Sequence, residues 1–168
     1  MKKINYIVLL IGAFCLLTVN SCKKKQLTRD EQIAEFRAQL TQADTTEMLK
    51  VCDTAMELLK GKKIDEVIET LYEYNDSTKE ISPVSKEMKK RLQHKFKIFP
   101  VLEYERKYYS FMLEGCNDVK YEITFATAEQ IGSVEPAKTA FMFNPVRVDG
   151  EWKLCVKTST DEVDLEKL

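Results

Sequence analysis

The spacing of apolar residues changes from a helical period to a strand period near Pro100. Ahead of this residue, Val84, Met88, Leu92 and Phe96 recur every four residues, as on one face of a helix. Beyond it, apolar and polar residues alternate over 119–125, as in a strand with one buried face. This order predicts an α+β fold, in which N-terminal helices pack on one face of a curved antiparallel sheet of about four strands.

The first two helices are predicted from capping residues and apolar stripes. A helix within 26–43 begins at a capping box formed by Thr28 and Glu31. A second helix begins near Asp44 and ends at Gly61, since glycine commonly follows the last turn of a helix. Its apolar stripe consists of Met48, Val51, Cys52, Ala55, Met56 and Leu59.

Two more helices are predicted before the change of period. The third covers 64–72 and is followed by a polar loop over 75–80. The fourth begins with Ser82 as its N-cap and Pro83 as its first residue, a position where the missing N–H of proline costs nothing. No strand is predicted between Leu71 and Ser82.

Aromatic residues are frequent in the predicted strands. In the strand over 103–113, Tyr109 and Phe111 fall on one face, and Tyr104 and Tyr108 fall on the other. Residues 115–118 form a turn, and 128–137 form a loop that leads into the strand of Phe141 and Phe143. The sequence therefore predicts a meander of antiparallel strands.

The last hairpin shows a slip in its apolar phase. A three-residue loop over 148–150 would place Arg147 opposite Glu151, and a bulge near Asn144-Pro145 would absorb the slip. The alternative, a two-residue Asp149-Gly150 turn, would place Arg147 opposite Trp152. The bulged hairpin is preferred because it pairs apolar residues with one another: Val146 with Trp152, Phe143 with Leu154 and Phe141 with Val156.

The first residues are typical of an export signal. Lys2 and Lys3 precede an apolar run over 4–19, which is shorter than the roughly 20 residues that span a bilayer. No second apolar run follows, which argues against a multi-pass membrane protein. The segment Val19-Asn20-Ser21-Cys22 resembles a bacterial lipobox, whose cysteine is lipidated after cleavage.

The lipobox resemblance implies a lipoprotein. It predicts a signal peptide over 1–21, a tether with a short helix over 22–44, an α+β domain over 45–158 and a polar tail over 159–168. The basic residues that follow Cys22 imply an outer-membrane anchor that faces the periplasm. The alternatives are an ordinary signal peptide and an uncleaved short anchor; in either case Cys22 would have no role in anchoring.

The charge and cysteine content restrict the chemistry. The 26 Lys and Arg residues balance 27 Asp and Glu residues, so no excess positive charge predicts a nucleic-acid partner. Cys52, Cys116 and Cys155 remain in the folded part without a CxxC motif, which leaves open either one disulfide or three reduced thiols. No metal site, cofactor or nucleotide-binding motif is predicted.

A family resemblance rests on two segments. Residues 55–71, with Gly61 between two helices, and the terminal hairpin 148–154 are similar to the cystatin-like cone of the nuclear-transport-factor-2-like superfamily. The resemblance covers about 45–158 and includes small lipoproteins of unknown function. It implies that any enzymatic activity would use acidic, histidine or tyrosine side chains that line the cone.

Candidate functional residues follow from the fold and the resemblance. No catalytic residue is assigned; Glu103, Glu105, Glu122, His94 and the tyrosines are the acid/base candidates, and His94 is expected on the solvent side of its helix. Aromatic side chains on the concave face would fill a core or wall an apolar pocket. These six are Tyr109, Phe111, Tyr121, Phe141, Phe143 and Trp152. A homodimer surface on the opposite face would use Tyr104, Tyr108, Met112 and Met142.

Three functions fit the sequence. The first is a non-catalytic, lipid-anchored domain that binds a small apolar ligand or another component of the cell envelope. The second is an isomerase-type or dehydratase-type enzyme with its site in the cone. The third is a structural or inhibitory interaction module.

Overall fold

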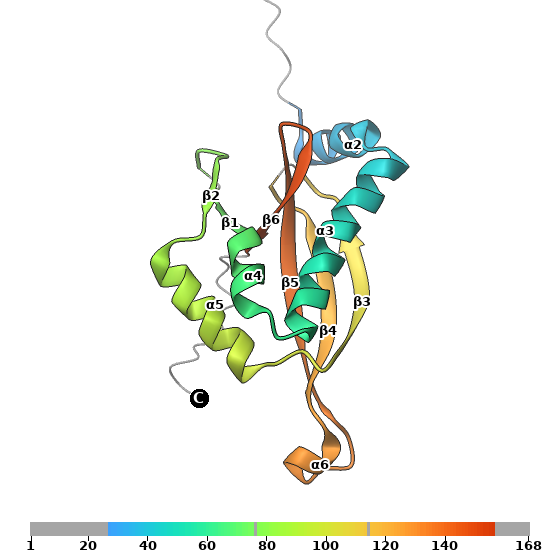
Figure 1. Cartoon of the computed structure of the whole chain (residues 1–168). Coiled ribbons are helices and arrows are strands. Elements are labelled where there is room, and N and C mark those ends of the chain that lie inside the picture. The colour runs from blue at the N-terminus through green and yellow to red at the C-terminus, as the bar shows by residue number, and fades with distance from the viewer. Residues whose placement is uncertain (1–26, 76, 114, 157–168) are drawn as a thin grey trace, which may run out of the picture.

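The computed structural model describes residues 27–75, 77–113 and 115–156. The predicted signal peptide, Cys22 and the tail over 159–168 lie outside these residues. Within them, helices cover one face of a curved, mostly antiparallel sheet (Figure 1), which confirms the predicted α+β fold. No helix of this part of the chain is long and apolar enough to cross a bilayer.

The sheet has six strands, not about four, in the order β2-β1-β6-β5-β4-β3. The strands predicted after Pro100 are β3 (Glu103–Ser110), β4 (Asp118–Ala126), β5 (Ala137–Val148) and β6 (Glu151–Val156). The additional strands, β1 (Leu71–Tyr74) and β2 (Ile81–Pro83), pair antiparallel, and β1 joins β6 in parallel. The prediction of no early strand pair is therefore wrong, because the chain enters β1 directly from the end of a helix.

Among the described residues, four helices lie ahead of β3 and one short helix lies between β4 and β5. They are α2 (Arg29–Gln39), α3 (Gln42–Lys60), α4 (Ile64–Thr70), α5 (Lys86–Ile98) and α6 (Ala128–Ile131). The predicted capping box is present at α2, where Thr28 Oγ1 accepts from the Glu31 amide at 3.3 Å. α3 starts slightly before its predicted position because Thr41 is its N-cap and Asp44 completes a second capping box.

The stripe of α3 forms the centre of the core. Met48, Cys52 and Met56 are fully buried against the sheet, whereas Val51 is half-buried. α4 and α5 cover the part of the sheet around β1 and β6, and the β4–β5 hairpin extends away from the helices with α6 at its tip (Figure 1). The core thus lies in one layer between the helices and the concave face of the sheet.

The start of α5 differs from the prediction. Ser85, not Ser82, is the N-cap, and its hydroxyl accepts from the Met88 amide at 3.2 Å. Pro83 is the last residue of β2, a short strand at the edge of the sheet. The missing N–H of proline is tolerated there because an edge strand has a neighbour on only one side. Leu92 and Phe96 are buried as predicted.

A bulge in β3 changes the predicted faces of its tyrosines. Arg106 pairs with Tyr121 but Tyr108 pairs with Lys120, so Lys107 is an extra residue in the strand. The extra residue reverses the alternation of faces, so even-numbered residues before the bulge lie on the same face of the sheet as odd-numbered residues after it. Tyr104 and Tyr109 both lie on the helix side of the sheet, and the prediction that Tyr104 shares a face with Tyr108 is wrong.

The last hairpin has the two-residue turn that the sequence analysis disfavoured. Asp149 and Gly150 have φ angles of 51° and 85°, as a type I′ turn requires, and Arg147 pairs with Trp152. The remaining helix-side pairs are Pro145 with Leu154 and Phe143 with Val156. No bulge interrupts this pairing, and the predicted bulged register is wrong. The phase slip arises because β5 is buried on both faces over 143–146.

Two buried asparagines explain why β5 is also buried on the face that points away from the helices. The side-chain Nδ2 of Asn117 donates to the Pro145 carbonyl at 2.9 Å, and the backbone N–H of Asn117 donates to Asn144 Oδ1 at 3.0 Å. Asn144 Nδ2 in turn donates to the Gly115 carbonyl at 2.8 Å. Pairing between β4 and β5 ends at Phe143, and these side chains satisfy the backbone groups beyond it.

Candidate functional site

The six predicted pocket aromatics do not share one environment. Tyr121, Phe141, Phe143 and Trp152 are buried in the core, Phe111 is half-buried, and Tyr109 is 46% exposed. Ring centroids of Phe96 and Phe141 lie 5.5 Å apart, and those of Tyr121 and Phe143 lie 6.1 Å apart. The buried rings therefore pack against one another and against α5. That these residues line a ligand pocket stays a prediction.

The predicted acid/base residues lie on the surface, with three acids on the sheet and His94 on α5. His94 lies on the exposed side of α5, as expected, and Glu103 and Glu105 are exposed on β3. Glu122 lies on the outer face of the sheet, where hydrogen bonds from Lys138 and Lys107 hold the pKa of its carboxyl below the usual range. The structure places Glu105 opposite Glu122, where both carboxylates pair with Lys107, and it places His94 apart from them on α5.

The residues of the predicted dimer surface also separate. Tyr108 and Met142 are exposed and both oppose Lys120, so they share the outer face of the sheet. Met112 instead lies beside Arg37 of α2, and Tyr104 faces α3.

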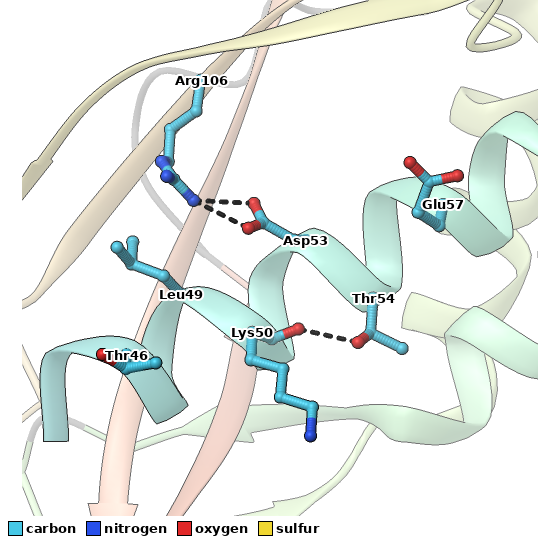
Figure 2. A pocket seen from close by; sticks show the side chains of 7 residues that line it. All are labelled: Thr46, Leu49, Lys50, Asp53, Thr54, Glu57 and Arg106. Atoms are coloured by element: carbon cyan, nitrogen blue, oxygen red, sulfur yellow. Dashed lines mark hydrogen bonds and ion pairs between the residues drawn. The ribbon is translucent and has the colours of Figure 1, made fainter. Parts of the chain in front are cut away.

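An open hollow lies between α3 and β3, with a volume of about 540 Å³. The α3 residues that line it recur at intervals of three and four positions and so share one face of the helix. The lining residues are Thr46, Leu49, Lys50, Asp53, Thr54, Glu57 and Arg106 (Figure 2). We call this hollow the α3–β3 groove.

Asp53 is the centre of the polar contacts in the groove. Arg106 Nη1 donates to both of its carboxylate oxygens, at 2.9 and 2.8 Å (Figure 2). Tyr121, whose ring lies in the core, donates a hydrogen bond from its hydroxyl to Asp53 Oδ1 at 2.5 Å. One turn further along α3, Tyr104 donates to Glu57 Oε1 at 2.5 Å. Both acids of the groove are therefore engaged by neighbouring residues.

The environment keeps the two phenols protonated. Burial and the hydrogen bond to Glu57 raise the pKa of Tyr104 from 10 to about 12. Burial, followed by the hydrogen bond to Asp53, raises the pKa of Tyr121 even further. Burial likewise raises the pKa of the neighbouring Cys52 thiol to about 12. At neutral pH the two phenols donate hydrogen bonds, and neither they nor the protonated Cys52 thiol is a base or a nucleophile.

The sequence analysis missed Asp53, Glu57 and Arg106. The spacing of the two acids by four residues beside a buried stripe would have indicated a shared helix face. The partnership with Arg106 depends on the bulge at Lys107, which no pattern in the strand indicated.

The described residues contain no group of three or more His, Cys, Asp or Glu side chains placed to hold a metal ion. Cys52, Cys116 and Cys155 are free thiols, with Cys52 and Cys155 buried. Comparisons with protein-family models, curated proteins and solved structures found no match.

Proposed function

We propose that this chain is a lipid-anchored protein of the bacterial cell envelope, held through Cys22 on the outer membrane and facing the periplasm. The proposal is based on the charged start, the apolar run and the lipobox-like residues 19–22. We also propose that the folded part is a cystatin-like cone. The early β1–β2 pair, which that superfamily usually contains, supports this assignment.

The folded domain would bind a ligand or an envelope protein in the α3–β3 groove without catalysing a reaction. The observation that carries this proposal is that both acids of the groove are already engaged. Asp53 accepts hydrogen bonds from Arg106 and Tyr121, and Glu57 accepts one from Tyr104. Neither acid is therefore poised as a free base. The remaining lining residues, Thr46, Leu49, Lys50 and Thr54, offer apolar surface, hydroxyls and one cation to a partner.

Photo-crosslinking in intact cells tests this proposal. A photoreactive amino acid would replace Thr46 or Thr54 in the full-length chain, and Glu69, exposed on α4, would serve as the matched control. We expect a discrete crosslinked product from the two groove positions and none from the control. Absence of a product from both groove positions, or an equal product from Glu69, would contradict the proposal.

An enzyme of the isomerase or dehydratase type is the second proposal. It is favoured by the closeness of two tyrosine–carboxylate pairs, whose rings lie 5.8 Å apart between centroids, to an open groove. In that case the protonated Tyr104 would donate a hydrogen bond to substrate after release from Glu57. A small molecule that co-purifies with the protein and is recovered chemically altered after incubation would support catalysis. Recovery of the same molecule unchanged would support binding alone.

A further inference from the structure

Basic side chains form a stripe along the exposed face of α5. The helix contains six Lys and Arg residues and one acid, Glu87. Lys86, Lys90, His94 and Lys97 recur at intervals of three or four residues, and all four are exposed. We call these four residues the α5 stripe. It extends over about 16 Å at the rise of an α-helix.

Acidic residues lie near the stripe on α4 and at Glu87 of α5 itself. α4 packs beside α5, but Asp65 accepts from Gln93 Nε2 at 2.8 Å and Glu66 pairs with Lys63 at 3.2 Å. Among the described residues, no hydrogen bond or ion pair engages the side chains of the stripe. The face of α5 opposite the stripe is fixed in the core by Leu92 and Phe96. The stripe is therefore an outward-facing row of three lysines and one histidine on a helix that is fixed in the core.

We propose that the α5 stripe binds the anionic headgroups of the membrane surface, as a second contact beside the lipid anchor. This inference rests on the proposed anchoring at Cys22. Thr28, the cap of α2, follows Cys22 by six positions, so the link between them can reach about 22 Å at most. A domain held so close to the surface meets headgroups at high effective concentration, and weak attraction is then sufficient.

The chemistry of the stripe favours a lipid surface over an acidic protein. Its permanent charges are lysines, which act as flexible point charges and do not select one geometry of acceptor, unlike the fork of an arginine. Each lysine near an anionic membrane contributes about 1 kcal/mol of attraction. In the sequence, three lysines at positions 23–25 directly follow Cys22 and would add positive charge next to the anchor.

A vesicle-binding experiment on the mature chain, residues 22–168 produced without lipid, tests the proposal. One variant carries Lys86→Gln, Lys90→Gln and Lys97→Gln. The matched control loses three exposed lysines outside the stripe and the groove through Lys60→Gln, Lys62→Gln and Lys79→Gln. Circular dichroism checks that both variants are folded. Co-sedimentation is measured with vesicles of phosphatidylcholine alone and with vesicles containing equal amounts of phosphatidylcholine and phosphatidylglycerol.

We expect the wild type to bind the anionic vesicles and to dissociate at high salt. The stripe variant should partition up to about a hundredfold more weakly, and the control variant by less than about threefold. Equal binding to both vesicle types, or equal loss in the two variants, would overturn the proposal. Binding to polyglutamate without binding to anionic vesicles would also overturn it and would indicate an acidic protein partner. Because the assay needs neither lipidation nor the α3–β3 groove, it fails or succeeds separately from the proposed function.

Discussion

Because Gly115 has no side chain, the loop after β3 can approach Tyr74 of strand β1 closely. Its φ is +84°, and an added Cβ would lie 2.1 Å from Cζ and 2.2 Å from the hydroxyl oxygen of Tyr74. Its carbonyl also accepts the hydrogen bond from Asn144. A Gly115→Ala substitution therefore adds both a strained backbone conformation and a steric conflict with the Tyr74 ring.

The two costs can be estimated separately. A left-handed conformation costs an alanine about 1–2 kcal/mol, and overpacking of a well-packed site costs about 1–3 kcal/mol. We expect Gly115→Ala to lower the free energy of unfolding by about 2–5 kcal/mol. Gly150 is the matched control, because its φ is +85° and no atom lies within 4 Å of its added Cβ. Gly150→Ala should then cost about 1–2 kcal/mol.

Urea unfolding of both variants, followed by circular dichroism, measures these costs. In a Tyr74→Ala background, the cost of Gly115→Ala should fall to that of Gly150→Ala, because the ring that conflicts with the methyl group is absent. If Gly115→Ala costs no more than Gly150→Ala in the native background, the close contact with Tyr74 does not limit this site and the reasoning is refuted.

Three further predictions concern thiols, a phenol and the anchor. At pH 8 an alkylating reagent should modify Cys116 in the native protein but spare Cys52 and Cys155, whose pKa values are raised to about 12 by burial; peptide mapping that finds all three modified equally would contradict this. Because folding raises the pKa of Tyr104 from 10 to about 12, its contribution to stability is complete below pH 10 and is lost as the pH rises to 12, and Tyr104→Phe should remove a high-pH step from the tyrosinate absorbance titration. An unchanged titration would show that Tyr104 is not the perturbed group. Cys22→Ala should abolish labelling with fatty acid in cells, and a variant that still labels would disprove lipidation at Cys22.

The change of apolar period near Pro100 was enough to predict the α+β class and the strands after Pro100, but not β1 and β2, which lie before α5. The pattern did not indicate β1, because Leu71 continues the apolar face of α4 and the strand has four residues. β2 was hidden by Ser82-Pro83, which is also typical of a helix start. β1 is completed by pairing with distant β6 and β2 by pairing with β1, and such short strands leave little local signal.

The candidate site was less predictable than the fold. The helix face of Asp53 and Glu57 can be derived from their spacing, but the residues opposite them cannot. The extra residue at Lys107 brings Tyr104 and Arg106 to the helix side, and bulges are set by tertiary packing. In the last hairpin, burial of both faces of β5 by Asn117 and its loop produced an apolar phase that resembled a bulge.

The central claim, that the chain is anchored through Cys22, is tested most directly by intact mass spectrometry of the protein purified from bacterial membranes. The account predicts a chain that begins at Cys22 and carries the added mass of a diacylglycerol and an N-acyl chain. A chain that retains Met1, or one cleaved elsewhere with Cys22 unmodified, would contradict it.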